Sequence, residues 1–194
     1  MNIQPLLNYI SNYISLTEEE EAFLTSKVSY RKYLKGQYIV QQGDVCKYEC
    51  FVISGCTKTF HVDDSGQEHI VMFSIENWWT SDMGSFITQT PADYNIQCID
   101  NTELIMFSFD VIEELYTEIP KLERFFRLII ERALVASQKR IVRNFSLSAK
   151  DRYLYFTNQY PKIEKLIPQY MVASYLGITK EFLSKIKSGL IKQQ

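Results

Sequence analysis

The sequence of 194 residues has no apolar run long enough to cross a bilayer. Its first ten residues, MNIQPLLNYI, lack the basic start and the apolar centre of a signal peptide. We therefore expect a soluble, cytoplasmic protein that has no membrane partner. Because 46% of the residues are hydrophobic, the chain has enough apolar side chains to build a substantial core.

The sequence also lacks the motifs of common enzymes, since it has neither a glycine-rich phosphate loop nor a G-x-S-x-G elbow. Its only two histidines, His61 and His69, have no nearby set of cysteines and make a poor metal site. An iron–sulfur cluster needs four thiolates that converge on one point. The four cysteines instead lie in or beside predicted strands, where we expect buried, reduced thiols: Cys46, Cys50, Cys56 and Cys98. We expect no enzyme activity, no metal and no cofactor.

Arginine is missing from the middle of the chain, between Arg31 and Arg124. Residues 1–120 carry 6 Lys or Arg and 18 Asp or Glu, which gives a net charge of −12. Residues 121–194 carry 15 and 5, which gives +10. A basic C-terminal part beside an acidic N-terminal part predicts a polyanionic partner for the former, although a solvated helix surface would also explain it.

Short β-rich runs separated by turns fill the region from Ser29 to Phe109. Residues 63–66, Asp-Asp-Ser-Gly, are typical of a hairpin loop between two such runs. The predicted strands lie at residues 37–43, 50–54, 56–62, 69–75, 94–99 and 103–109. Several short strands at regular spacing predict a small barrel or sandwich.

Helices are predicted on both sides of this region. Residues 4–14 form a short amphipathic pattern, and Thr17 with Glu20 has the spacing of a capping box that starts a helix ending near Lys27. After the strands, we expect Asp110 to cap the next helix, and Pro120 to open a longer one.

The longer helix, residues 120–145, contains no glycine and no internal proline. A helix of about 25 residues would be roughly 37 Å long. One stripe of it recurs every three or four positions: Phe126, Ile130, Leu134, Ser137, Ile141 and Phe145. The stripe can pack on the barrel of its own chain or pair with its copy in a second subunit, and we expect both.

The tail begins with Ser148, which has capping-box spacing to Asp151 and starts a helix that ends before Pro161. Pro168 can start a further helix, and Gly177 can end that helix in a left-handed turn.

Thr179 can then cap a last helix, so that residues 168–187 predict a helix-turn-helix, with an ordinary helical hairpin as the alternative. Its apolar wedge would be Ala173, Leu176, Ile178, Leu183 and Ile186.

The chain resembles the Crp/Fnr family of bacterial transcription regulators over essentially its whole length. Gln42-Gly43-Asp44 and Gly55 match a turn and a later glycine of the family's barrel, and the tail matches its helix-turn-helix skeleton at four positions in the same order. These four positions are Ala173, Gly177, Leu183 and Ile186.

This resemblance implies an α+β fold in three parts. Residues 1–119 would form a cyclic-nucleotide-binding-like β-roll, which is a double-stranded β-helix. Residues 120–146 would be a dimerisation helix, and residues 147–194 an all-α helix-turn-helix domain. Because the sequence ends at Gln194, we expect little or no β-hairpin wing, as in the short, wingless members of the family.

By resemblance, Lys180, Glu181 and Lys185 stand at the family's base-reading positions. Lysine can donate to guanine, and glutamate can accept from cytosine. We expect Phe182 to pack inward, with contact to a thymine methyl group as the alternative. The candidate DNA-binding residues are Gln169, Thr179, Lys180, Glu181, Ser184, Lys185 and Lys187, with Lys192 as a further candidate for phosphate contact.

Residues 81–86 match the family's phosphate-binding cassette, and Asp82 stands where a glutamate binds the ribose hydroxyl. The cassette's arginine should fall near Ala92-Asp93 and is absent, so we expect no useful affinity for cyclic AMP. The barrel could instead bind a neutral or cationic ligand, or its interior could simply be a hydrophobic core. An arginine of the long helix could also replace the missing cassette arginine. The candidate effector-pocket residues are Trp78, Trp79, Asp82, Met83, Gly84, Tyr94 and Arg127.

The resemblance therefore implies a homodimeric, sequence-specific DNA-binding transcription regulator with a palindromic operator. It leaves RNA polymerase and an unidentified small-molecule effector open as further partners. The candidate dimerisation residues are Phe126, Ile130, Leu134, Ser137 and Ile141. The alternative is an effector-sensing or protein-interaction module that has lost DNA binding.

Overall fold

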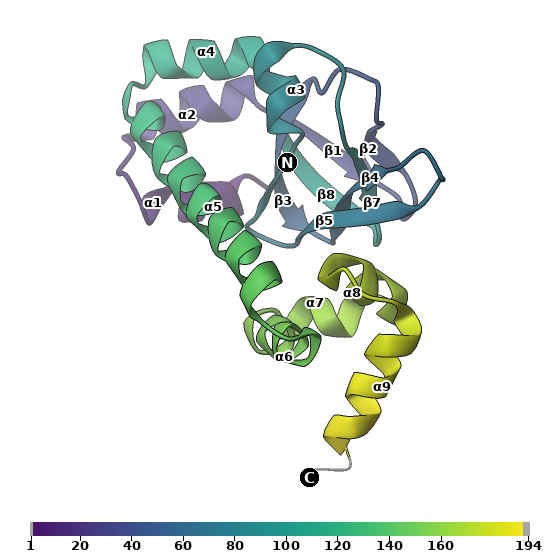
Figure 1. The fold of residues 1–194 in the computed structure, drawn as a ribbon. Helices are drawn as coiled ribbons and strands as arrows, with labels where there is room; N and C mark the ends of the chain where they lie inside the picture. Colours follow the sequence, from purple (N-terminus) through teal and green to yellow (C-terminus); the bar gives the residue numbers. More distant parts are fainter. Residues whose placement is uncertain (1, 192–194) are drawn as a thin grey trace.

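The computed structural model describes residues 2–191 and has the predicted α+β fold, with an antiparallel β-roll, a long helix and a helical tail (Figure 1). The long helix α5 runs from the roll toward the tail, and α9 points away from the rest of the molecule (Figure 1). The helices are α1 (Gln4–Ser11), α2 (Glu18–Lys27), α3 (Met83–Thr88), α4 (Phe109–Glu118), α5 (Lys121–Ser146), α6 (Ala149–Gln159), α7 (Pro161–Leu166), α8 (Gln169–Leu176) and α9 (Lys180–Ile191). No helix within residues 2–191 is both long and apolar enough to span a membrane.

The roll consists of two four-stranded antiparallel sheets, in the orders β1-β8-β3-β6 and β2-β7-β4-β5. The strands are β1 (Ser29–Tyr33), β2 (Tyr38–Val40), β3 (Tyr48–Ser54), β4 (Thr57–Val62), β5 (Glu68–Ser74), β6 (Trp79–Thr80), β7 (Asn95–Cys98) and β8 (Thr102–Ser108). All six predicted strands are present. The sequence pattern missed β1 and β6, because β1 buries only Tyr33 and β6 is two residues long.

Capping residues place most helix starts where the sequence predicts them. Thr17 and Glu20 form the expected capping box, and the hydroxyl of Ser148 accepts the amide of Asp151 at 3.2 Å. The prediction that Asp110 caps α4 is wrong. Ser108, the last residue of β8, is the cap, and its hydroxyl accepts the amide of Val111. The sequence pattern also missed α7, which begins at Pro161 directly after α6 ends.

The main core lies between the roll and the helices α1, α2, α4 and α5. Its centre is aromatic: the ring of Trp79 lies 5.3 Å from that of Phe51 and 5.2 Å from that of Phe126, between ring centroids. Phe125 is completely buried against Phe126. The first turns of α5 are therefore part of the roll's own core.

A second core joins the roll to the tail. Phe60, Ile70 and Phe73 of β4 and β5 pack in one cluster with residues of α6 to α9, including Phe156 and Leu176. The tail thus packs directly on the edge of a sheet.

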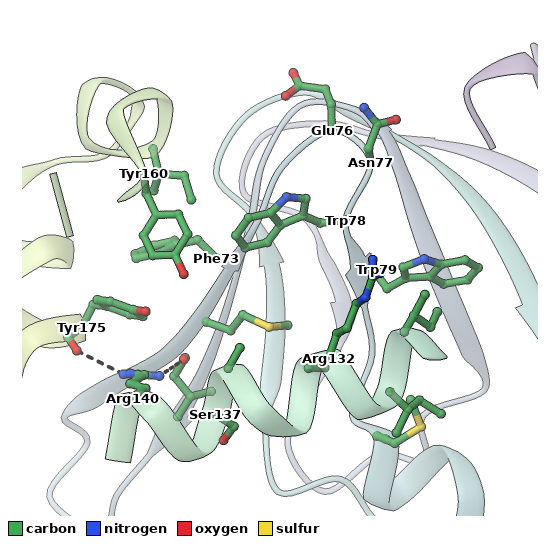
Figure 2. Close-up of a pocket in the computed structure, with 18 of the residues that line it drawn as sticks. Phe73, Glu76, Asn77, Trp78, Trp79, Arg132, Ser137, Arg140, Tyr160 and Tyr175 are labelled. Carbon is green, nitrogen blue, oxygen red and sulfur yellow. Dashed lines mark hydrogen bonds between the residues drawn. The ribbon is translucent and has the colours of Figure 1, made fainter. Parts of the chain in front are cut away.

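Polar contacts fix this junction. The hydroxyl of Ser174 in α8 accepts the amide of Ile70 at 3.1 Å and donates to the carbonyl of Glu68 at 2.9 Å. The guanidinium of Arg140 in α5 donates to the carbonyls of Val71 and, at 3.1 Å, of Tyr175 (Figure 2). One arginine therefore connects the long helix to both the roll and the tail.

Candidate functional site

The predicted helix-turn-helix is present in α8 and α9. Gly177 ends α8 with φ of +65°, in the left-handed region that a residue without Cβ adopts readily. The amide of Ile178 donates to the carbonyl of Ala173 at 3.0 Å, which closes the turn. The hydroxyl of Thr179 accepts the amide of Phe182 at 3.1 Å and caps α9. Pro168 precedes α8 as its cap residue and does not occupy its first turn.

The apolar wedge between the two helices consists of the predicted residues. Ala173, Leu176 and Leu183 are buried, and Ile178 and Ile186 are partly buried in the same cluster. The wedge sets which face of α9 is turned inward, and so it also sets which face is left open.

The open face of α9 carries Lys180, Glu181, Ser184 and Lys185, all of which are exposed. Positions 180 and 184, and positions 181 and 185, are one turn apart, so these side chains lie on adjoining parts of one surface. Thr179 and Gln169 are exposed at the starts of α9 and α8. The open face therefore combines cationic, anionic and hydroxyl groups on the first two turns of the helix.

Two predicted tail residues lie differently. The expectation that Phe182 packs inward is wrong: its side chain is 49% exposed, because Leu183 takes the inward position and is 1% exposed. Lys187 is half-buried, and its Nζ lies 3.4 Å from a carboxylate oxygen of Glu164. It belongs to the tail's own packing more than to the open face. Lys192 lies outside the described residues.

The predicted stripe of α5 divides into two parts. Phe126 is buried in the main core, and Ser137 is exposed and lines a cavity described below. Beyond Phe126, Leu128 and Ile129 are half-buried, and most of the later apolar side chains of α5 are open to solvent in the single chain. The exposed ones are Ile130, Leu134, Val135, Ile141, Val142 and Phe145.

The cassette around α3 is filled by the chain's own groups. The Asp82 side chain is buried, and one of its oxygens accepts the amide of Ser85 at 3.0 Å. The other oxygen accepts the amides of Asp93, at 2.9 Å, and Tyr94, at 3.1 Å. Asp82 thus caps α3 and holds the segment in which the sequence lacks an arginine.

A cavity of about 670 Å³ lies elsewhere, between β5, the loop before β6, the face of α5 turned to them, and the tail (Figure 2). Of the seven predicted pocket residues, it brings together Trp78, Trp79 and Met83. Asp82, Gly84 and Tyr94 do not line it. Arg127 is also absent from its walls, because it forms an exposed ion pair with Glu131 at 2.8 Å.

Aromatic rings and arginines form the outer end of the cavity. The side chains of Phe73, Trp78, Tyr160 and Tyr175 surround it, and the guanidinium of Arg140 lies 4.0 Å from the ring centroid of Tyr175 (Figure 2). Its walls therefore come from both the roll and the tail.

One buried polar residue at the inner end, Glu49, was not found from the sequence, and it lines the cavity beside the predicted pocket residue Trp79. Its side chain is 4% exposed. Neither Oε2 of Glu49 nor Nε1 of Trp79 has a hydrogen-bond partner within the described residues. Burial raises the pKa of the Glu49 carboxyl to about 7, and a hydrogen bond from Ser81 partly opposes this shift. The sequence signal was strand alternation, which places Glu49 on the same face as Phe51, but the predicted strand began only at residue 50.

The cysteines and histidines do not converge. All four cysteines are buried thiols, and residues 2–191 contain no group of three or more His, Cys, Asp or Glu side chains that could hold a metal ion. Burial raises the pKa of each thiol; the value for Cys98 is about 11. The ring of His69 contacts the carboxylate of Asp63 at 2.6 Å in the β4–β5 hairpin loop.

Comparison with known sequences identifies a cyclic nucleotide-binding domain at residues 30–118. The chain is 25% identical to the transcriptional activator protein anr of Pseudomonas aeruginosa, over 93% of this chain and 80% of that protein. It is 23% identical to the anaerobic regulatory protein of Haemophilus influenzae, over 93% and 76%.

Comparison with solved structures agrees in fold. FixK2 from Bradyrhizobium japonicum matches with a TM-score of 0.75 and 15% identity, over 86% of this chain and 85% of that one. The Thermus thermophilus catabolite activator protein matches with a TM-score of 0.56 and 21% identity, over 92% and 85%. The β-roll, long helix and helical tail therefore follow one another here as they do in these structures.

Proposed function

Because the chain belongs to the Crp/Fnr family of transcription regulators, we propose that it is a cytoplasmic, homodimeric regulator that binds specific DNA sequences. Its relatives are regulators and not enzymes, and the chain is likewise not an enzyme. The proposal is carried by the open face of α9, where Lys180, Glu181, Ser184 and Lys185 stand on a helix that extends from the body (Figure 1).

A helix of this kind fits the major groove, which accepts one α-helix whose amino-terminal residues reach the base edges. Lys180 and Lys185 can donate to guanine, Glu181 can accept from the amino group of cytosine, and Ser184 can do either. Gln169 and Thr179, which are exposed at the starts of the two helices, would contact phosphate groups.

Dimerisation would proceed through α5. Its exposed apolar stripe, including Ile130, Leu134 and Ile141, supports a parallel pairing of two copies about a two-fold axis. Such a dimer would present its two α9 helices about 34 Å apart, or a multiple of this, and would read a palindrome.

Electrophoretic mobility shift against fragments of the genome that encodes the protein tests DNA binding. We expect the protein to shift a restricted set of fragments, with affinity that falls steeply as salt rises. A protein that shifts no fragment, or shifts all fragments equally, would contradict sequence-specific regulation.

The variant Lys185→Ala tests whether α9 reads bases or contacts the phosphate backbone. If Lys185 reads a guanine, we expect a loss of about 1–3 kcal/mol on the selected palindrome only. If it contacts phosphate, affinity falls evenly across sequences and the salt dependence becomes shallower. Lys35→Ala, an exposed lysine of the roll, is the control. Unchanged binding by Lys185→Ala would remove this residue from both roles.

The cassette would not bind cyclic AMP. A buried cyclic phosphate needs backbone amides and a cation, and no lysine or arginine occurs at residues 81–120. The oxygens of Asp82 already accept three backbone amides, which leaves at most one of about four acceptor positions for a ribose hydroxyl.

Isothermal titration with cyclic AMP and cyclic GMP tests this prediction, and we expect no saturable heat at micromolar concentration. If binding is found, Arg127→Ala and Arg132→Ala would show whether an arginine of α5 supplies the missing cation.

A further inference from the structure

We propose that the inner end of the cavity beside α5 binds a small amine or amidine that carries an aromatic ring. The N–H groups of this ligand would donate hydrogen bonds to the carboxylate of Glu49. This site adjoins the cassette at Met83 but does not include Asp82, and the proposal does not depend on DNA binding.

The first observation is the state of Glu49. Its side chain is 4% exposed, Oε2 has no hydrogen-bond partner, and it forms no ion pair with any cation within residues 2–191. An unpartnered buried carboxyl oxygen is costly, so native structures rarely keep one without a use. A ligand that donates to this oxygen would remove the cost.

The second observation is the position of Trp79. In the pairing of β3 with β6, Phe51 stands opposite Trp79, and Glu49 precedes Phe51 by two residues. Glu49 and Trp79 are therefore diagonal neighbours on one face of the sheet, with Cβ atoms about 7 Å apart. The indole N–H of Trp79 is also buried and unpartnered. One acceptor and one donor thus flank the same small space.

The surrounding walls are aromatic. Tyr9, Trp79 and Phe126 line this end of the cavity together with Met83. Aromatic faces attract an ammonium or amidinium group and also pack against an aromatic ring, so both parts of the proposed ligand find a complementary surface.

The cavity is lined by the carboxyls of Glu49 and Glu76 and by three arginines, Arg132, Arg140 and Arg143, so a cation is favoured only directly beside Glu49. Burial raises the pKa of this carboxyl to about 7, and a bound cation would instead stabilise its ionised form. Arg132 also lines the cavity, but its guanidinium lies 4.7 Å from the ring centroid of Tyr13 and donates to the Tyr13 hydroxyl at 2.9 Å. Arg132 should weaken the binding of a cation only moderately.

Direct titration tests the proposal with three probes of similar size: benzamidine, 2-phenylethylamine and 3-phenylpropionate. The only two tryptophans, Trp78 and Trp79, both line the cavity, so intrinsic fluorescence reports occupancy. We expect both nitrogen compounds to change the fluorescence saturably, and the carboxylate to bind at least about tenfold more weakly. Equal or tighter binding of 3-phenylpropionate, or no saturable binding of either nitrogen compound, would overturn the proposal.

Two variants locate the site. Glu49→Gln keeps the size of the side chain and should weaken benzamidine binding by about tenfold or more, through loss of a charge-assisted hydrogen bond. Circular dichroism and thermal unfolding would confirm that the variant folds. Unchanged benzamidine binding by a folded Glu49→Gln would overturn the assignment.

Arg132→Gln provides a second test that does not depend on the folding of the Glu49 variant, because Arg132 is exposed. Removing this positive charge should tighten benzamidine binding by a few-fold and leave binding of a neutral analogue, benzamide, within about twofold. Weaker benzamidine binding in Arg132→Gln would contradict a cation site at this end of the cavity.

Discussion

The two halves of α5 form one helix with one apolar pattern, yet only the first half buries its apolar side chains within the chain. In the first half, Leu122, Phe125 and Phe126 are buried in the core of the roll. In the second half the apolar side chains remain open, up to Phe145, which is 87% exposed. Within residues 2–191, Arg140 is the one residue of this half that donates hydrogen bonds to both the roll and the tail.

This difference separates two uses of the same sequence signal. The spacing of apolar residues predicts that a helix buries one face, but it does not say which chain provides the cover. The first half of α5 stabilises its own domain. The second half has a surface suited to a second copy of the helix, and this half is the basis of the proposed dimer.

Substitution of Phe125 should have the largest effect on the fold. Phe125→Ala removes a completely buried ring between Tyr9, Tyr13 and Phe126, and should lower the free energy of unfolding by about 3–5 kcal/mol. Urea denaturation measures this loss.

The matched change in the open half, Phe145→Ala, should leave the stability of the monomer within about 0.5 kcal/mol. If Phe125→Ala and Phe145→Ala lowered the free energy of unfolding equally in dilute solution, the two halves of α5 would be equally buried within the monomer.

The buried carboxyl of Glu49 should also make the stability of the fold depend on pH. Burial raises the pKa of Glu49 from 4.5 to about 7, so between these values the folded state holds a proton that the unfolded state has lost. Stability should therefore fall as pH rises from 4.5 to 7, by about 3 kcal/mol from this group, and stay level above 7.

Denaturation of wild type and Glu49→Gln across this pH range isolates the contribution of Glu49. Cys46, Cys50 and Tyr116, whose ionisable groups interact with Glu49, are present in both proteins. If the free energy of unfolding varied with pH in the same way for both proteins, the raised pKa of Glu49 would be contradicted.

Charge in the open half should change assembly more than folding. We expect Leu134→Glu to give a folded monomer by light scattering, because two buried carboxylates would face each other across the dimer axis. Lys139→Gln alters the net charge by the same amount on another face of α5 and should leave the dimer intact. An unchanged dimer of Leu134→Glu would place the interface elsewhere.

The sequence predicted those parts of the molecule that depend on local signals. Capping residues such as Thr17 and Ser148, the left-handed Gly177 and the apolar spacing of α8 and α9 specify structure within a few residues. For the same reason, the missing cassette arginine was visible in the sequence.

Several of the misses depend on how neighbouring elements pack. Asp110 was the predicted cap of α4, but Ser108, the last residue of β8, is the cap. The side chain of Phe182 turned outward because Leu183 filled the wedge. The cavity combines β3, β5, α5 and the tail, so no single stretch of sequence could indicate that Glu49 lies on it.

The contact of Ser174 with β5 has a consequence for the solubility of the protein. β5 is the last strand of its sheet, and an open strand edge is a template on which a second chain can add by hydrogen bonding. The hydroxyl of Ser174 occupies an amide and a carbonyl of that edge, at Ile70 and Glu68, while Arg140 occupies the carbonyl of Val71. The tail therefore acts as a cover against strand-to-strand aggregation, and any movement that lifts α8 from the roll exposes a surface prone to self-association.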